Sequence, residues 1–281
     1  MTEESGPPTP QPRLAVLIDA DNAQPSVIEG LLAEVAKFGV ASAKRIYGDW
    51  TSTSHAQWKL SLLKHSIIPI QQFAYTRGKN ATDSSLIIDA MDLMHTHRFD
   101  GFCLVSSDSD FTKLAQRLRE EGLMVLGFGE RKTPESFVAA CDKFVYTEVL
   151  RPEAAIAVKV AAERTSVPAV EPDSATRRTS KASGAAAAPA KTSVATPALP
   201  SELILRAIED ASDDSGWAHL GAVGNLLTKL RPDFDPRLYG SKKLSDLLKK
   251  HPHLFTLEER GSAGLASKVI YVRAALAGSS R

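Results

Sequence analysis

The sequence predicts an α/β domain with a mostly parallel sheet and helices on both faces, followed by a small unit of helices and strands. Two observations predict the first part. Short apolar runs alternate with amphipathic helical patterns up to about residue 150, and this alternation is typical of βα units. Aspartates follow the apolar runs at residues 14–18 and 102–105, and ligands gather at the carboxyl ends of parallel strands.

Each expected element has its own pattern. The runs interpreted as strands are continuous and apolar, and the helical segments repeat apolar residues three or four positions apart. Pro25 suits the first turn of its helix, and Gly39 suits its end. In chain order we expect strands over residues 14–18, 42–49, 67–75, 102–107 and 123–129, and helices over residues 25–39, 55–66, 83–98 and 110–122, with a last helix inside residues 133–148.

The remaining residues predict a tail, a linker and a second domain. Residues 1–12 are polar and Pro-rich, so we expect a disordered tail before the domain at residues 13–150. Residues 151–199 predict one helix and then a flexible linker, because Ala, Pro, Ser, Thr and Lys dominate and cannot bury a core. Residues 200–275 predict a winged-helix pattern of three helices and two strands, with Ser201 as the first N-cap and residues 276–281 as a tail.

The composition excludes several classes of protein. The formal net charge is +1, with −4 over residues 1–150, +3 over residues 151–200 and +2 over residues 201–281. This distribution fits a catalytic unit beside a nucleic-acid-binding unit. Cys103 and Cys141 lie in apolar surroundings and predict neither a disulfide framework nor a zinc site. No apolar run reaches the roughly 20 residues of a membrane span, and no signal-peptide pattern is present. We therefore expect a cytoplasmic protein with no membrane partner.

Aspartates are the most informative residues of the chain, because several of them are expected to converge at one edge of the sheet. Converging carboxylates repel one another unless a cation neutralises them. Oxygen ligands without sulfur or imidazole partners suit Mg²⁺ or Mn²⁺. The sequence therefore predicts a divalent-metal site with Asp19, Asp83, Asp108 and Asp110 as ligands and catalytic residues, and with Asp21 and Asp89 as secondary ligands.

Several of these aspartates also suit a purely structural role. Asp21 is a good turn or capping residue. Asp83 and Asp110 each precede a helical run and suit an N-cap, a role that is compatible with metal binding. Asp89 lies inside an apolar helical run, so its carboxylate should face a partner, a cation or a cavity.

Other polar residues near the expected site are candidates for phosphate binding. Ser106 and Ser107 can hydrogen-bond a phosphate or a metal-bound water, or they can shape the turn after their strand. Arg77 and Lys79 stand shortly before Asp83 in the sequence. They suit contacts to a phosphate beside the metal, and an ordinary solvated loop is the alternative interpretation.

Three motifs carry a resemblance to a known family: LAVLIDADNA, KNATDSSLIIDAMDL and FCLVSSDSDFTKLAQRLREEGLMVLGFG. In this order they resemble an NYN domain, a branch of the PIN-like nucleases, over roughly residues 12–150. The resemblance implies a Rossmann-like fold and a metal-dependent ribonuclease, and the matching site residues are Asp19, Asp83, Asp108 and Asp110. The family often has glycine before the last aspartate pair, where this chain has Ser107, and Asp89 matches the family pattern less firmly as a ligand.

The segments LYGSKKLSDLLKKHPHLFTLEE and KVIYVRA resemble a LOTUS (OST-HTH) domain over about residues 200–275. This resemblance implies a small winged-helix module that binds RNA or a protein partner. The candidate RNA-binding residues, which can also be an ordinary solvated helix face, are Lys242, Lys243, Lys249 and Lys250.

The leading hypothesis is a metal-dependent endoribonuclease with a tethered RNA-binding module. The alternative is a non-catalytic RNA-binding adaptor. A third hypothesis is a haloacid-dehalogenase-like phosphatase, because DADNA resembles the first motif of that family, although the family prefers Thr or Val where Ala23 stands. The sequence leaves open the RNA substrate, the cleavage specificity, the choice and number of metal ions, homo-oligomerisation, and whether the C-terminal domain binds RNA or protein.

Overall fold

The computed structural model describes residues 10–51, 53–73, 81–151, 197–260 and 269–275. The expected linker and its helix fall almost wholly outside the described residues, and so do most of the two expected tails. Arg77 and Lys79 also lie outside them. No helix among the described residues is long and apolar enough to cross a membrane.

The N-terminal domain is a six-stranded sheet in which every neighbouring pair of strands is parallel. The strand order is β3-β2-β1-β4-β5-β6. The strands are β1 (Arg13–Asp19), β2 (Val40–Gly48), β3 (Ile68–Gln71), β4 (Gly101–Val105), β5 (Met124–Gly129) and β6 (Lys143–Tyr146). The predicted α/β class with a parallel sheet is confirmed.

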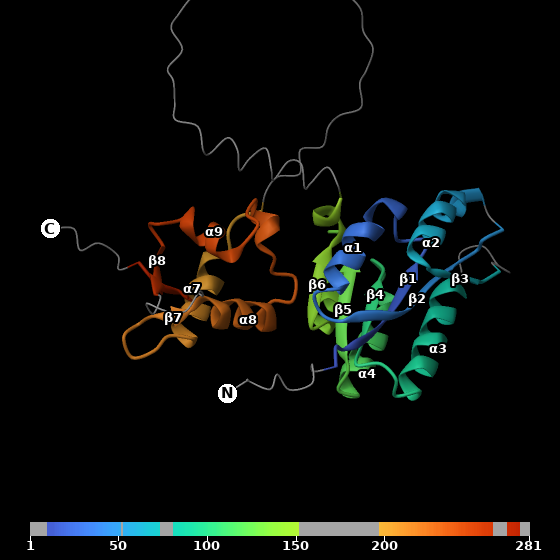
Figure 1. Cartoon of the computed structure of the whole chain (residues 1–281), viewed down its shortest axis with the longest axis horizontal. Helices are drawn as coiled ribbons and strands as arrows, with labels where there is room; N and C mark the ends of the chain where they lie inside the picture. Colours follow the sequence, from blue (N-terminus) through green and yellow to red (C-terminus); the bar gives the residue numbers. More distant parts are fainter. Residues whose placement is uncertain (1–9, 52, 74–80, 152–196, 261–268, 276–281) are drawn as a thin grey trace, which may run out of the picture.

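Helices cover both faces of this sheet (Figure 1). Residues of α3, α4 and α5 pack on one face, and residues of α1 and α2 pack on the other. The helices are α1 (Ile28–Val35), α2 (Lys59–His65), α3 (Ala81–His95), α4 (Thr112–Glu120) and α5 (Glu135–Ala140), with short 3-10 turns η1 (Pro25–Val27), η2 (Thr53–Trp58), η3 (Ser109–Phe111) and η4 (Thr147–Leu150).

The central strands are buried on both faces, as their continuous apolar runs predict. In β1, Ala15 and Leu17 belong to the core of one face, while Val16 and Ile18 belong to the core of the other. Every residue of β4 is buried. Each fully buried aliphatic side chain contributes roughly 1.5–3 kcal/mol, so the ends of β1 and β4 are firmly positioned. Cys103 and Cys141 are buried and unpaired, as expected.

The strand β6 is the one element of this sheet that the sequence analysis missed. Its four residues begin two residues after α5 ends and fall inside the segment that is expected to contain the last helix. Phe144 and Val145 are buried on opposite faces, so tertiary packing explains the strand although its sequence is too short to show alternation.

The C-terminal domain consists of helices packed on a three-stranded antiparallel sheet of order β7-β9-β8. The elements are α7 (Ser201–Asp210), β7 (Ala218–His219), α8 (Leu220–Leu230), η5 (Pro236–Tyr239), α9 (Leu244–Lys249), β8 (Phe255–Arg260) and β9 (Val269–Ala274). The short strand β7 was not expected. Ser201 begins α7 instead of capping it, since Pro200 is the N-cap and no side chain caps the helix.

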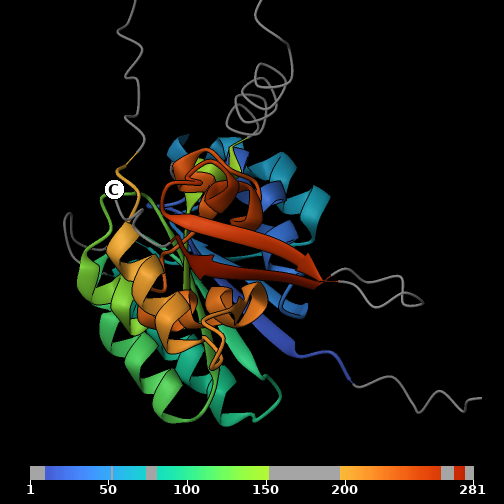
Figure 2. The same cartoon turned by 90° about the vertical axis from the view of Figure 1, so that its left-hand side faces the viewer.

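The C-terminal domain packs against the β6 edge of the parallel sheet, as Figures 1 and 2 show. The backbone N–H of Phe144 donates to the carbonyl of Pro232 at 3.0 Å, so the segment after α8 takes the place of a neighbouring strand. The Lys143 Nζ donates to the Phe234 carbonyl at 2.8 Å. The first bond satisfies a backbone N–H that the edge strand would otherwise expose, and the second ties the Lys143 side chain to the C-terminal domain.

A charge network reinforces this contact between the domains. Arg237 donates to Asp235 from Nη2 at 2.6 Å and from Nε at 3.0 Å, and it also donates to Glu34 of α1. Glu34 and Asp235 are each only 7% exposed. Burial alone would raise the pKa of Asp235, but the hydrogen bonds and the charge of Arg237 lower it. The pair between Arg237 and Glu34 joins the two domains, and breaking it would leave the Glu34 carboxylate without one of its cationic partners.

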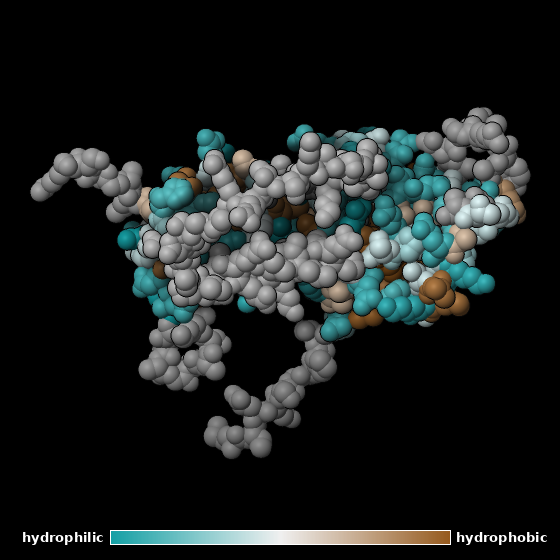
Figure 3. Space-filling view, turned by 90° about the horizontal axis from the view of Figure 1, so that it is seen from above, coloured by the Kyte–Doolittle hydropathy of each residue, from teal (hydrophilic) through white to brown (hydrophobic). Residues whose placement is uncertain are grey.

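Among the described residues, no further strand pairs with β3 at the opposite edge of the sheet, and this edge carries exposed apolar side chains. Figure 3 shows brown, apolar surface at that end of the molecule. A hollow of about 930 Å³ lies between α2 and β3, and the exposed apolar side chains of this edge are Leu60, Leu63, Ile68 and Phe73. Contiguous apolar surface often marks an interaction site.

Removal of the Arg237 guanidinium should loosen the domain contact. Arg237→Ala leaves the buried Asp235 without its ion-pair partner and leaves Glu34 with Lys37 alone, so we expect a loss of stability of about 3 kcal/mol and a larger radius of gyration. Chemical denaturation and small-angle X-ray scattering measure the two effects. Arg206→Ala, which removes an exposed pair with Asp210 at 3.9 Å, is the matched control. Equal behaviour of the two variants would show that the network does not hold the domains together.

Candidate metal centre

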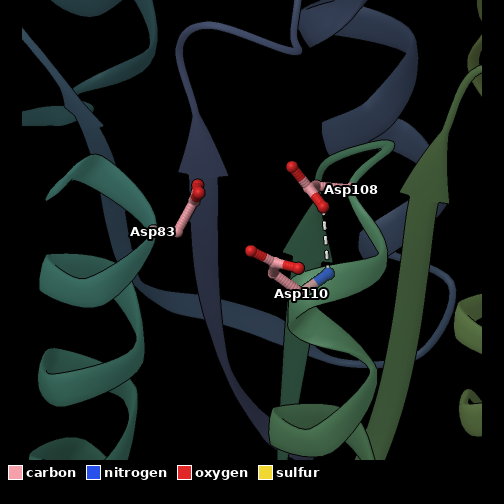
Figure 4. Close-up of side chains that lie close together, drawn as sticks. All are labelled: Asp83, Asp108 and Asp110. Carbon is pink, nitrogen blue, oxygen red and sulfur yellow. Dashed lines mark hydrogen bonds between the residues drawn. The ribbon is translucent and has the colours of Figure 1, made fainter. Parts of the chain in front are cut away.

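Three carboxylates meet at the carboxyl edge of the parallel sheet (Figure 4). Asp83 lies in the first turn of α3, Asp108 follows β4 as the N-cap of η3, and Asp110 lies in the first turn of η3. One oxygen of each lies within 4.8 Å of the others. Ligands on opposite sides of Mg²⁺ lie about 4 Å apart, so small side-chain rotations would let the three share one cation.

The turn after β4 is held by its own hydrogen bonds. The Asp108 carboxylate accepts from the backbone N–H of Asp110 at 2.9 Å, and the Asp108 N–H donates to the Ser106 Oγ at 3.1 Å. The Ser107 Oγ accepts from the backbone N–H of Glu130 at 2.8 Å. Both serines are buried, so in this structure they shape the turn, which was one of their two expected roles.

Asp19 lies at the same edge but is not one of the three grouped carboxylates. It ends β1 and is only 1% exposed. Its carboxylate accepts from the Ser106 hydroxyl at 2.8 Å, the Asn22 Nδ2 at 2.7 Å and the Asp21 backbone N–H at 3.0 Å. Through Ser106 it therefore joins β1 to the turn that carries Asp108.

The electrostatics of the group favour a bound cation. Burial is the largest of the effects that raise the pKa of Asp83 to about 6, and the charges of Asp19, Asp108, Asp110 and Asp21 add to it. Burial also raises the pKa of Asp19, against the lowering effect of its hydrogen bonds. A divalent cation would relieve this repulsion. The oxygen-only donor set fits Mg²⁺ or Mn²⁺.

The two expected secondary ligands have other partners. Asp21 is 58% exposed and contacts the Nε2 of His55 at 3.2 Å. Asp89 accepts hydrogen bonds from Arg45 on one oxygen and from Tyr47 on the other. Asp89 thus has the partner that a carboxylate in an apolar helix requires, and neither residue belongs to the group of three.

The candidate lysines of the C-terminal domain are exposed and lie around α9. Lys249 approaches Glu259 at 3.7 Å, and Lys250 donates to the Gly240 carbonyl at 2.7 Å. Lys242 and Lys243 precede the helix. These lysines lie on a different domain from the acidic group, so any joint role requires an RNA that spans both.

Asn22 and His55 are site residues that the sequence analysis did not select. The Asn22 side-chain amide donates a hydrogen bond to the Asp19 carboxylate, and the His55 ring contacts the Asp21 carboxylate. The spacing of Asn22 three residues after Asp19 suits an Asx-type turn and could have indicated the first contact. Nothing in the local sequence indicates the second, because His55 comes from η2.

Replacement of Asp83 should stabilise the metal-free protein. The pKa of Asp83 is raised from 3.8 to about 6 on folding, so its stabilising contribution is full below pH 3.8 and is lost as the pH rises through 6. Near pH 7.5 in EDTA, Asp83→Asn should raise the free energy of unfolding by about 1 kcal/mol, a value reduced for the screening of this half-buried group by solvent. This corresponds to an increase in Tm of about 2–4 °C.

The comparison is made by thermal unfolding at about pH 7.5 and pH 5, with Asp92→Asn, an exposed position on the same helix, as control. The increase in Tm of Asp83→Asn over the wild type should be smaller at pH 5. It should reverse with excess Mg²⁺ or Mn²⁺, since the wild type alone keeps all three carboxylates. A lower Tm for Asp83→Asn without metal would contradict the proposed repulsion.

Comparisons with known proteins agree with this architecture. A family model for the NYN domain matches residues 13–150, and one for the OST-HTH/LOTUS domain matches residues 197–266. No curated protein matches the chain.

Two solved structures are similar in part. An uncharacterized protein from Nitrosomonas europaea, solved by NMR, is 46% identical over 38% of this chain and 98% of its own, with a TM-score of 0.28. A protein of unknown function from Vibrio parahaemolyticus is 19% identical over 52% of this chain and 96% of its own, with a TM-score of 0.41. Because both TM-scores are low, the assignment rests on the family models and the fold: the chain consists of an NYN domain of the PIN-like nuclease superfamily followed by an OST-HTH/LOTUS domain.

Proposed function

We propose that the protein is a metal-dependent endoribonuclease whose active site is the group of Asp83, Asp108 and Asp110. The convergence of these carboxylates within 4.8 Å is the observation that carries the proposal. The PIN-like nuclease family of the first domain and the RNA-binding family of the second support the same substrate class. Mg²⁺ or Mn²⁺ fits the oxygen-only donor set.

Each acidic residue has a defined task in this proposal. Asp83, Asp108 and Asp110 bind the cation. A bound divalent cation supplies a coordinated water of lowered pKa and offsets the negative charge of the phosphate. Asp19 completes the negative site and, through Ser106, fixes the turn that presents Asp108. Asp21 contacts His55 and Asp89 pairs with Arg45. In this proposal neither of the two aspartates is a metal ligand.

The remaining candidates have three different roles in this proposal: they support the turn, bind phosphate or form a solvated surface. Ser106 and Ser107 orient the turn through their hydrogen bonds. Arg77 and Lys79 contact the phosphate next to the cleaved bond. Lys242, Lys243, Lys249 and Lys250 form a solvated face around α9, which was the second of their two expected roles, with Lys249 3.7 Å from Glu259 and Lys250 bonded to the Gly240 carbonyl at 2.7 Å.

The proposal is tested by cleavage of labelled single-stranded and structured RNAs with Mn²⁺, Mg²⁺ or EDTA. Asp108→Asn should reduce cleavage at least about 100-fold, because it removes a ligand, and Ser106→Ala should reduce it about 10-fold, because it only loosens the support of one. Asp92→Asn, at an exposed position of α3, should cleave like the wild type.

Three outcomes would contradict the proposal. RNA binding without cleavage in every metal would favour the adaptor. Cleavage that is equal in Asp108→Asn and the wild type would point to a contaminating nuclease or to another site. Release of phosphate from a small phosphoester without RNA cleavage would favour the phosphatase.

A further inference from the structure

The sheet of the C-terminal domain has one face that packs on helices and one that does not enter the core. In the register of β7, β8 and β9, Ala218 lies opposite Val272, and Phe255 lies opposite Ala274. Ala218, Phe255 and Val272 are buried in the core of this domain. Because side chains alternate between the faces of a sheet, the neighbours of these residues point to the other face. Figure 1 shows this sheet at the side of the domain away from β6.

Two aromatic rings and two guanidinium groups form a stacked series on that outer face. The Arg260 guanidinium lies 4.6 Å from the ring centre of Tyr271 and 4.9 Å from that of Trp217. The Arg273 guanidinium lies 4.7 Å from the ring centre of Trp217. The order is therefore Tyr271, Arg260, Trp217 and Arg273, and His219 contacts Tyr271 edge-on at 5.8 Å. We call the four residues of the stacked series the arginine–aromatic face.

The two arginines differ in how their charges are compensated. Arg260 hydrogen-bonds Glu258 at 3.2 and 3.3 Å, and Asp213 also acts on its charge. Arg273 has no ion pair or hydrogen bond with any residue that the structure describes, and its Nε is buried without an acceptor. Across the strand pair its neighbour is the neutral Thr256.

The stacked series gives the Arg273 guanidinium a single aromatic partner among the described residues. Arg273 is the last member of the series, and no aromatic ring other than Trp217 lies over its guanidinium within the described part of the chain. A cation–π contact at an exposed site contributes only about 0.5–1 kcal/mol. This contact orients the guanidinium but gives its N–H groups no acceptor among the described residues. A ligand that stacks on the plane and accepts hydrogen bonds at its edge would use both properties.

We propose that the arginine–aromatic face binds unpaired RNA, with a base stacked on the Arg273 guanidinium and a phosphate at its edge. Single-stranded RNA is recognised by stacking of bases on aromatic rings and arginine planes, and a sheet face of this composition provides both. This inference deepens the RNA-binding half of the proposed function, on which it rests. It locates RNA on the sheet and not on the lysines around α9.

The charge balance makes the two locations distinguishable. On the outer face Glu258 and Asp213 offset Arg260, whereas Arg273 has no compensating carboxylate among the described residues. A single phosphate contact gives a slope of log K against log salt of about −0.7 for single strands. Binding through Lys242, Lys243, Lys249 and Lys250 together would give a slope of about −3 by the same rule.

The test uses the full chain in EDTA, so that binding is measured apart from cleavage. The probe is a labelled, unstructured RNA of about 12 nucleotides, compared with the same strand in a duplex. Fluorescence anisotropy gives the Kd over a series of salt concentrations, and a gel confirms that the RNA stays intact. Arg273→Ala should weaken binding about tenfold or more, and Arg273→Lys, which keeps the charge but not the plane, should fail to restore it.

A double substitution of Lys242→Ala and Lys243→Ala is the matched control and should change Kd by less than about threefold. Trp217→Phe keeps a ring under Arg273 and should retain most of the affinity, so a defect in Trp217→Ala with a normal Tm can be assigned to stacking. Equal binding of duplex and single strand, a steep salt dependence, or no effect of Arg273→Ala would overturn the proposal. So would a lack of RNA binding by the wild type. Cleavage results do not enter this test, so the inference can stand if the nuclease proposal fails.

Discussion

The parallel pairing of β1 with β4 is the constraint on which the candidate metal centre depends. Ile18 lies opposite Val105 in this pair, so Asp19 and Ser106 are the next residues along and meet in a hydrogen bond of 2.8 Å. Both strands are buried on both faces, and a slip of one residue would move side chains of different size from one close-packed core to the other. The apolar core thus fixes the position of Asp19 and of the turn that carries Asp108.

The same site is a source of instability in the folded chain. Ionised carboxylates are brought together at a partly buried edge, and their repulsion contributes to the raised pKa of Asp83. Elsewhere among the described residues, the half-buried Asp89 pairs with Arg45, and the buried Glu34 and Asp235 pair with Arg237. At the edge of the sheet three acids are instead grouped with one another. This contrast supports a metal-binding function over a structural one.

Much of the fold was predictable from the sequence, because the inner strands are long apolar runs and the helices have clear periodicity. The three grouped aspartates were among the predicted ligands for the same reason: each follows a strand or opens a helix. The details that escaped prediction depend on tertiary contacts. The strand β6 is too short to show a pattern. Asp89 pairs with Arg45, which is 44 residues away in the sequence, and Arg237 pairs with Glu34, which is 203 residues away. The arginine–aromatic face likewise depends on the register of β8 and β9.

The central claim is that Asp83, Asp108 and Asp110 hold a divalent cation. Anomalous diffraction from crystals of the full chain soaked in Mn²⁺ tests it most directly, because the signal identifies the ion and its position without any assay of activity. An anomalous peak is expected at about 2.2 Å from an oxygen of each of the three carboxylates. A fully occupied Mn²⁺ at another site, with no peak among these three aspartates, would contradict it.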